Sequence, residues 1–597
     1  MDTQIQQLRL QVPTPEQTRL AFCKPNVRDL KSWIQDLPKA NIGETARLLY
    51  QALIELNNFK TDAENRVQLL ELLRPEVLFI NSQLEKHFLN NSVMLDERPQ
   101  KVANLCQALQ NHLTVGYKIA IVEALQQKHS VLALALQRAV HSMFISQVRT
   151  YQLYFTAPPL FWLELHQLYK IASKNNMHTQ LTRDPMLDPI SEQSVESAYS
   201  CALLLSCART NQMRQSDIAI LANILPSWVL LTKLQNADLP SSLFVADLNH
   251  DAPPRYKELL ERASSETRVG LNTQDLAEAL VRHQQSFGNP SIKHKIAIPD
   301  NMSSTLLAQL CSAWDNIAQR DFQRTSSNGT LQVCLGMSAV HYYLSDQEPF
   351  EDTLKSHQVG LVKYNTDNAE RDIWDTASDV KSDGEFNPLQ VDLIEYGSMP
   401  PLGAAAYKRD TQASAALYPT YTLAIVNSSP GGYCLAWHDA VPSQLQAGEI
   451  IAICQVENNA WSTALIRWIR QVDTEGTQMG IELIAPNAQP CGLQLLRSND
   501  TSSHFLRALL VPEIPALSQP ASVIAPRIPF QEGHKVAINQ QGTELKATLA
   551  KRSMHTGSIS QFEYKVTTPI KPVETQTTEA STVSSLGEDF DSLWKSL

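Results

Sequence analysis

The feature that most constrains this chain is a change of sequence texture near its middle. From about residue 13 to about 285 the sequence is rich in Leu, Ala and Gln and poor in Gly, and apolar residues such as Leu49, Leu53 and Leu56 recur at helical spacing. From about 328 to 570 short β-branched and aromatic runs alternate with Gly, Pro, Asn and Ser. This pattern predicts helices followed by small β-barrels.

The length of the chain, 597 residues, exceeds what one hydrophobic core supports, so several domains are expected. The predicted fold class is multi-domain, all-α in its first half and β in its second. The run TLQVCLGMSAVHYYL (330–344) is counted among the strand-like segments. The expected parts are a helical bundle or scaffold (1–285), a junction helix with the first barrel strands (286–344), an insertion (345–418), the core of a β-barrel (419–500), a second small β-unit (501–570) and a flexible tail (571–597).

Charge and cysteine content exclude several classes of function. The net charge is −11, and no run of Lys and Arg offers the basic face that a nucleic acid polymer needs. No apolar run reaches the roughly 18–20 residues that span a bilayer. The nine cysteines are scattered without a Cys-x-x-Cys pair, so neither a disulfide framework nor a zinc site is expected. These observations favour a cytoplasmic protein without a bound metal.

A run of ordered motifs lies between 421 and 483. The segment TLAIVNSSPGGYCLAW contains the pattern [Asp/Asn]-x-Ser-x-x-Gly as Asn427, Ser429 and Gly432. WSTALIRWIRQV follows with an internal Arg467, and QMGIELI has a Gly-hydrophobic-x-hydrophobic pattern that begins at Gly480. In this order and spacing the motifs resemble the PilZ domain, many of whose members bind cyclic di-GMP. The resemblance implies a β-barrel in which Asn427, Ser429 and Gly432 contact that ligand.

The second PilZ signature, Arg-x-x-x-Arg, is found at Arg320 and Arg324, before the first barrel strand. Asn427 follows Arg324 by 103 positions, and leaving out the 74 residues 345–418 reduces this separation to 29. A separation of about this many residues is the length that one strand hairpin requires. The interpretation is a single barrel whose early hairpin carries a long insertion.

The chemistry of cyclic di-GMP explains these residue types. A guanidinium group donates two hydrogen bonds at once to phosphate oxygens or to the O6 and N7 atoms of guanine, so Arg320 and Arg324 together clamp one dinucleotide. Asn427 and Ser429 offer short polar groups to a guanine edge, and Gly432 permits a tight turn. The alternative is a solvated pair of arginines and an ordinary hairpin loop.

The predicted function is a cyclic di-GMP receptor that couples ligand binding to rearrangement of a helical region that binds a protein partner. The alternative is a scaffold or adaptor with a degenerate PilZ barrel that binds no nucleotide. An enzyme is the third and weakest option, because no Gly-rich phosphate loop, zinc-protease or serine-hydrolase motif occurs. No catalytic residue and no cofactor is therefore predicted. The pair His250-Asp251 is interpreted as part of a loop.

The last residues of the chain carry an amphipathic pattern. Phe590, Leu593, Trp594 and Leu597 fall at i, i+3, i+4 and i+7 after a polar Thr/Ser/Glu tract. Such a stripe is typical of a short docking helix. It is predicted to bind either an unidentified protein partner or another part of this chain, and the helical half is the other expected partner-binding region.

Overall fold

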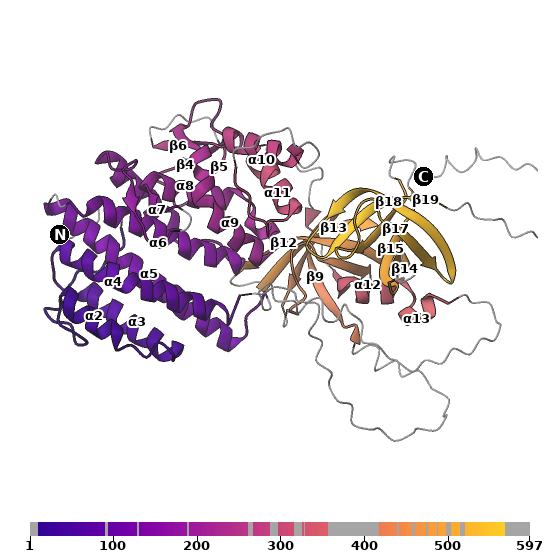
Figure 1. The fold of residues 1–597 in the computed structure, drawn as a ribbon, viewed down its shortest axis with the longest axis horizontal. Helices are drawn as coiled ribbons and strands as arrows, with labels where there is room; N and C mark the ends of the chain where they lie inside the picture. The colour runs from indigo at the N-terminus through magenta and orange to yellow at the C-terminus, as the bar shows by residue number, and fades with distance from the viewer. Residues whose placement is uncertain are drawn as a thin grey trace, which may run out of the picture.

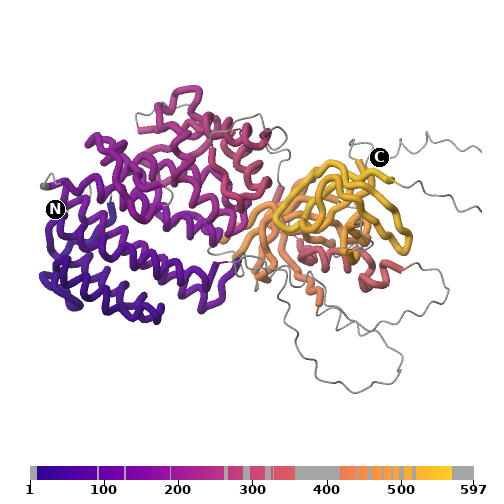
Figure 2. Tube along the Cα trace, viewed as in Figure 1, coloured from indigo at the N-terminus to yellow at the C-terminus, as the bar shows by residue number. Residues whose placement is uncertain are grey.

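The computed structural model has two lobes along its longest axis, a helical lobe at the N-terminal end and a lobe of two β-barrels (Figure 1, Figure 2). The arrangement confirms the predicted fold class. The structure describes residues 10–89, 93–127, 130–187, 190–260, 267–286, 296–315, 325–326, 329–355, 417–438, 441–455, 460–472, 476–485, 488–496, 503–513 and 520–567.

Several helices of the helical lobe begin with a polar side chain that caps the first turn. Asn41, Asp62 and Ser194 each accept a hydrogen bond from a backbone N–H in the turn that follows. The helices are α2 (Val27–Gln35), α3 (Ile42–Asn58), α4 (Ala63–Glu85), α5 (Glu97–Gln127), α6 (Leu132–Gln152), α7 (Phe161–Lys174), α8 (Val195–Cys207) and α9 (Gln215–Trp228).

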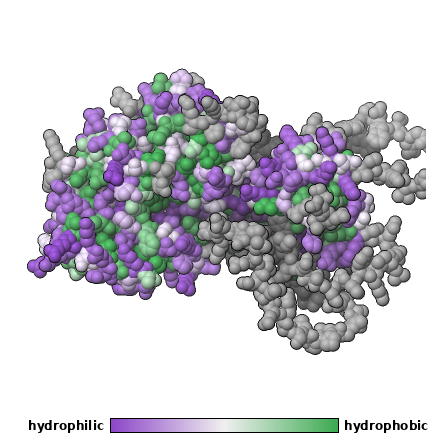
Figure 3. Space-filling view, viewed as in Figure 1, coloured by the Kyte–Doolittle hydropathy of each residue, from purple (hydrophilic) through white to green (hydrophobic). Residues whose placement is uncertain are grey.

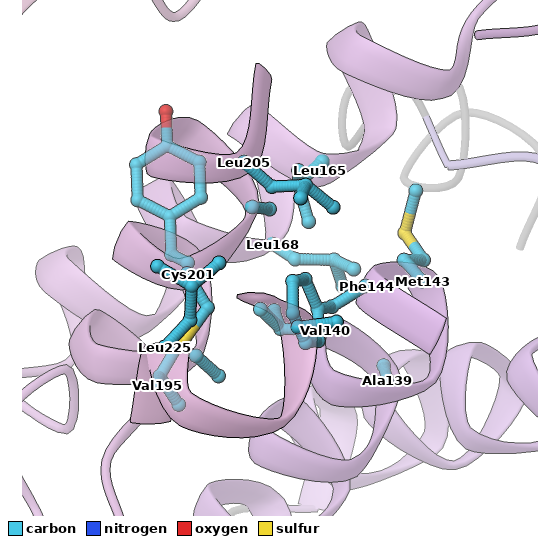
Figure 4. Packing of buried hydrophobic residues seen from close by; sticks show 14 of the residues in the cluster. Ala139, Val140, Met143, Phe144, Leu165, Leu168, Val195, Cys201, Leu205 and Leu225 are labelled. Carbon is cyan, nitrogen blue, oxygen red and sulfur yellow. The ribbon is translucent and has the colours of Figure 1, made fainter. Parts of the chain in front are cut away.

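The apolar faces of these helices meet in one continuous core. Figure 4 shows part of it, where Val140 and Phe144 of α6 pack with Leu165 of α7 and Leu205 of α8. On the face seen in Figure 3, hydrophilic residues cover most of the outer surface of the lobe, with hydrophobic residues visible between them. Among the residues that the structure describes, no helix combines the length and the apolar character needed to cross a bilayer.

A buried charge cluster joins α4, α6 and the loop before α8. Two nitrogen atoms of Arg74 donate to the two carboxylate oxygens of Asp184, each at 2.7 Å. Arg138 lies 3.1 Å from the same carboxylate and also donates to Glu71. The side chain of Asp184 is fully buried. Burial alone raises the pKa of Asp184, but the hydrogen bond from Arg74 and the charges of Arg74 and Arg138 outweigh it and lower that pKa to about 2.

The end of the helical half contains a small sheet that the sequence pattern did not predict. Its strand order is β3-β6-β4-β5, and all neighbouring strands are antiparallel. Two further helices and a two-stranded ribbon complete this half of the chain. The bounds are β1 (Thr182–Arg183), β2 (Glu192–Gln193), β3 (Lys233–Asn236), β4 (Phe244–Asp247), β5 (Arg255–Tyr256), β6 (Arg268–Asn272), α10 (Gln274–Ser286) and α11 (Ser304–Asp315), with short 3₁₀ turns at Thr210–Gln212, Val229–Leu231 and Lys257–Leu259.

The first barrel closes through six strands in the cyclic order β8-β9-β10-β13-β12-β11, and β7 adds to the side of β9. Alternate side chains point inward, and Val333, Leu435, Ile466 and Met479 belong to the buried core. The bounds are β7 (Thr325–Ser326), β8 (Thr330–Leu335), β9 (Thr420–Ser429), β10 (Gly432–Trp437), β11 (Ile450–Gln455), β12 (Trp461–Val472) and β13 (Gly476–Ala485).

The prediction of a strand over residues 336–344 is wrong, because this segment forms helix α12 (Gly336–Leu344). Gly336 directly follows β8 and has a φ of +83°, a conformation that glycine adopts without strain. Met337 and Val340 of α12 pack between the outer face of the first barrel and the second barrel. The helix is apolar on several sides because it is covered on several sides.

The second β-unit is also a closed barrel, with strand order β14-β15-β16-β19-β18-β17. It begins at Gln489, earlier than the expected position 501. Its own core contains Leu493, Val536 and Phe562. The bounds are β14 (Gln489–Leu495), β15 (Leu506–Val511), β16 (Ser522–Pro526), β17 (Lys535–Gln540), β18 (Thr543–His555) and β19 (Ile559–Val566).

The chain leaves the first barrel after β8 and returns at β9, and the two ends of this excursion are tied together. The hydroxyl of Tyr343 donates to the backbone oxygen of Tyr418 at 2.8 Å. The ring centroids of Tyr342 and Tyr418 are 4.7 Å apart. A short helix α13 (Phe350–Thr353) follows α12. The remainder of the predicted insertion, 356–416, lies outside the described residues.

Arg214 joins the helical lobe to both barrels. Its guanidinium donates to Ser558 Oγ at 2.5 Å, in the β18–β19 turn, and to Ala447 O at 3.4 Å, before β11. It also lies 3.7 Å from the carboxylate of Glu449. The side chain of Arg214 therefore links the helical lobe, to which it belongs, to the first and the second barrel.

Candidate ligand-binding site

Three of the predicted site residues lie at one hairpin of the first barrel. Asn427 and Ser429 are on β9, and Gly432 is the first residue of β10. In the strand pairing Ser429 stands opposite Gly432, and Asn427 stands opposite Cys434. The Ser429 hydroxyl donates to Gly432 O at 3.2 Å. The [Asp/Asn]-x-Ser-x-x-Gly pattern thus places its polar side chains together on the outer face of the barrel.

The glycine of the pattern is required by close packing of the strands. A Cβ atom at Gly432 would lie 2.0 Å from the backbone oxygen of Ile481 on β13. The neighbouring strand is therefore in contact with the Cα of Gly432, and no larger residue fits while β10 and β13 keep their pairing.

Arg320 and Arg324 lie outside the described residues. Strand β7 begins at Thr325, the residue bonded to Arg324, and Thr325 and Ser326 pair with Ser428 and Asn427. Consecutive Cα atoms are about 3.8 Å apart. The chain that follows the Arg-x-x-x-Arg pattern thus enters the barrel directly beside the hairpin, although β8 and β9 are separated by the excursion.

The later strands add charged and aromatic groups to the same outer face. Glu482 of β13 is paired with Gly432, and its carboxylate forms an ion pair with Arg467 of β12. The pairing of β12 with β13 shifts register between Ile466 and Trp468, so Arg467 occupies a bulge. Bulges commonly re-aim a side chain near a functional site. The PilZ resemblance points to Arg467 of this pair, whereas Trp468 is not among the residues that the sequence predicts.

The pair His250-Asp251 lies in a loop that contacts the start of α7. The Asp251 carboxylate accepts hydrogen bonds from the N–H groups of Leu160 and Leu163 and so caps α7, which agrees with a loop role for His250-Asp251. Within the described ranges, no group of three or more His, Cys, Asp or Glu side chains is arranged to hold a metal ion. The tail pattern of Phe590, Leu593, Trp594 and Leu597 lies outside the described residues.

Comparisons with known proteins agree with the three-part fold. Residues 28–240 match the family described as the N-terminal domain of the cyclic-di-GMP receptor FimW, residues 243–490 its middle PilZ domain, and residues 491–567 the FimW C-terminal β-barrel domain. The cyclic-di-GMP receptor FimW of Pseudomonas aeruginosa is 47% identical over 615 aligned positions, which cover all of both chains. No solved structure matches the chain. The PilZ resemblance is confirmed, and the chain belongs to the family of FimW cyclic-di-GMP receptors.

Proposed function

We propose that this chain is a cytoplasmic receptor for cyclic di-GMP and not an enzyme, with Arg320, Arg324, Asn427, Ser429 and Gly432 forming the ligand site. The observation that carries the proposal is the position of Asn427 and Ser429 beside β7, the strand that follows Arg324. The name of the Pseudomonas aeruginosa relative supports the same ligand.

The proposed site suits the chemistry of the ligand. The two arginines neutralise the phosphodiester charges and hydrogen bond to phosphate or guanine acceptors. Asn427 and Ser429 provide a carbonyl, an amide and a hydroxyl for the edge of one base. A site that contacts both phosphates and a guanine edge distinguishes cyclic di-GMP from mononucleotides.

Titration calorimetry with cyclic di-GMP tests the proposal. The Asn427→Ala and Arg324→Ala proteins are expected to bind about ten- to a hundredfold more weakly than the unmodified protein, because each loses hydrogen bonds, charge-assisted in the case of Arg324. Arg47→Ala is the matched control, since Arg47 is an exposed arginine of α3 in the helical lobe. Its affinity should be unchanged.

The outcomes separate the receptor from the alternative function. Weakening confined to the two site variants supports the receptor. A folded, unmodified protein that gives no binding signal contradicts it and favours an adaptor whose helical half or tail holds a protein partner.

Ligand binding is proposed to rearrange the helical lobe against the barrel. Strand β12 contains both Arg467, whose partner Glu482 is paired with Gly432 of the hairpin, and Gln471, which contacts the helical lobe. The backbone N–H of Gln471 donates to Tyr154 O at 3.0 Å, and its side chain donates to Val93 O at 3.1 Å. A ligand that shifts β12 therefore acts directly on the lobe that we propose binds a partner.

Small-angle scattering tests this coupling. Saturating cyclic di-GMP is expected to change the scattering profile of the unmodified protein, because the two lobes lie along the longest axis and a change in their angle alters the overall dimensions (Figure 1). Asn427→Ala at the same ligand concentration serves as the control with reduced occupancy. Identical profiles with and without bound ligand would rule out the rearrangement while leaving the receptor function intact.

A further inference from the structure

Two groups of contacts join the helical lobe to the barrels, and they differ in chemistry. In the first group, Val93 and Tyr154 of the helical lobe belong to the buried core of the first barrel. Gln471 of β12 bonds to the same two residues: its backbone N–H donates to Tyr154 O at 3.0 Å, and its side chain donates to Val93 O at 3.1 Å. This group, called the hinge, combines buried apolar side chains with hydrogen bonds to the backbone and is the firmer of the two.

The second group, called the latch, consists of Arg214 and the polar groups that it contacts. Its guanidinium donates to Ser558 Oγ at 2.5 Å and to Ala447 O at 3.4 Å. The carboxylate of Glu449 lies 3.7 Å from the same guanidinium. Ala447 and Glu449 belong to the first barrel and Ser558 to the second. The latch therefore stays closed only while the helical lobe and both barrels keep these relative positions.

A glycine of the second barrel makes room for the latch. A Cβ atom at Gly557 would lie 2.2 Å from Arg214 Cζ and 2.3 Å from Arg214 Nε, so the guanidinium rests on the backbone of the β18–β19 turn. Because a guanidinium is the far end of a flexible side chain, a methyl group at position 557 would displace it without disturbing the barrel. The φ of Gly557 lies outside the left-handed region, so alanine brings no conformational strain there.

Close to the latch, the helical lobe and the second barrel leave a cleft between them. Its volume is about 240 Å³, and it is lined by Ser304, Thr305 and Ala308 of α11 and by Arg552, Ser553, Met554 and His555 of β18. A hydrogen bond from Thr305 Oγ1 to His555 O, at 3.1 Å, joins its two walls. Since α11 and β18 are not closely packed here, the helical lobe can turn away from the second barrel while exposing little apolar surface.

The latch is connected to the hairpin of the ligand site through the backbone of the first barrel. Gly448 N donates to Ile466 O at 2.8 Å, and Ile466 N donates to Glu449 O at 3.0 Å. Ile466 directly precedes the bulge at Arg467, and the ion-pair partner of Arg467, Glu482, is paired with the first residue of β10. A ligand that moves the hairpin therefore also displaces the acceptors of the latch.

We infer that binding of cyclic di-GMP opens the latch and lets the helical lobe turn about the hinge, away from the second barrel, in an inference that rests on the proposed receptor function. Arg214 is then a positioning residue, which holds the lobe in place without contacting the ligand. The direction follows from the geometry, because a contact that needs three parts of the molecule in register is weakened when any one of them moves. By linkage, opening the latch in turn favours the bound ligand.

Small-angle scattering and calorimetry on the full chain test the latch. Without ligand, Arg214→Ala and Gly557→Ala should each shift the scattering profile toward that of the unmodified protein saturated with cyclic di-GMP. Both variants should also bind cyclic di-GMP about three- to tenfold more tightly, because the ligand no longer has to open the latch. Arg282→Ala is the control, since Arg282 is an exposed arginine of the helical lobe that pairs with Glu278 on its own helix. It should show neither effect.

A double variant shows whether the two substitutions act on one contact. In Arg214→Ala no guanidinium remains to be displaced, so adding Gly557→Ala should change neither the affinity nor the scattering profile further. Gains in affinity that multiply in the double variant would contradict the shared contact. Thermal melting curves of each variant check that the protein remains folded, and a general loss of structure would weaken binding, which is the opposite of the expected gain.

The outcomes separate the latch from the function on which it rests. The inference is overturned if both folded single variants keep the profile and affinity of the unmodified protein, or bind more weakly, while the unmodified protein itself binds the ligand and changes its profile. The receptor function and the rearrangement then stand. If the unmodified protein binds without a change of profile, the latch and the rearrangement fall together and the receptor remains. If it does not bind cyclic di-GMP at all, every one of these proposals falls.

Discussion

Replacing Asp184 with asparagine is expected to lower the free energy of unfolding of the helical lobe by about 3–5 kcal/mol. The substitution keeps the size of the side chain but removes the charge that compensates Arg74 and Arg138, whose side chains are 5% and 2% exposed. Chemical denaturation followed by the helical circular dichroism signal measures the loss. Glu97→Gln is the control, because Glu97 forms an exposed ion pair with Lys101 and should change stability by less than about 0.5 kcal/mol.

The same variant should show a distinct dependence on pH. The pKa of Asp184 is lowered to about 2 in the folded protein, against about 3.9 in an unfolded chain. Its ionised form therefore stabilises the folded state above about pH 4, and this contribution is lost as the pH falls from 4 through 2. The stability difference between the unmodified protein and Asp184→Asn should shrink over that range. A difference that stays constant would show that Asp184 does not titrate as its contacts indicate.

Replacing Gly432 with alanine should destabilise the first barrel by about 3 kcal/mol or more and abolish high-affinity binding of cyclic di-GMP. The new methyl group would overlap the backbone oxygen of Ile481. Neither can rotate away, because the backbone fixes the position of a Cβ atom and the oxygen is itself part of the backbone. Strands β10 and β13 must then separate, which moves the hairpin that carries Asn427 and Ser429. Loss of tertiary structure on heating and ligand titration measure the two effects.

Gly533→Ala is the matched control for the glycine substitution. Gly533 has a φ of +83°, and no atom lies within 4 Å of the position that its Cβ would take. Alanine at this position should lower the free energy of unfolding by only about 1 kcal/mol, which is the strain of a positive φ in a residue other than glycine. Ligand affinity should be unchanged. Equal losses of stability in the two variants would show that contact with Ile481 is not what requires glycine at 432.

The fold class and part of the site could be predicted because local patterns in this chain agree with its tertiary structure. Strands such as β10 and β12 have the composition and length of barrel strands, and the Asn427 to Gly432 pattern occupies a single hairpin. The helices of the N-terminal half carry a regular apolar stripe because each packs against a common core.

The features that were missed depend on long-range contacts. Helix α12 has a strand-like composition, with Val340, Tyr342 and Tyr343, and it becomes a helix because two barrels enclose it. The strands β3 to β6 are two to five residues long, too short to show a period. The position of Trp468 opposite Gly480 cannot be read from one strand, because the bulge at Arg467 breaks the alternation of β12 and the pairing with β13 decides which residues meet.

The tie between Tyr342, Tyr343 and Tyr418 has a consequence for how this family can change in length. Because both ends of the excursion are held at one point of the barrel, residues can be added or removed between them without altering strand register. In general, each doubling of the length of a flexible connection between two fixed points costs only about 0.6 kcal/mol of closure entropy. The position is therefore suited to evolutionary insertion, and equally to the placement of a reporter domain inside an otherwise intact receptor.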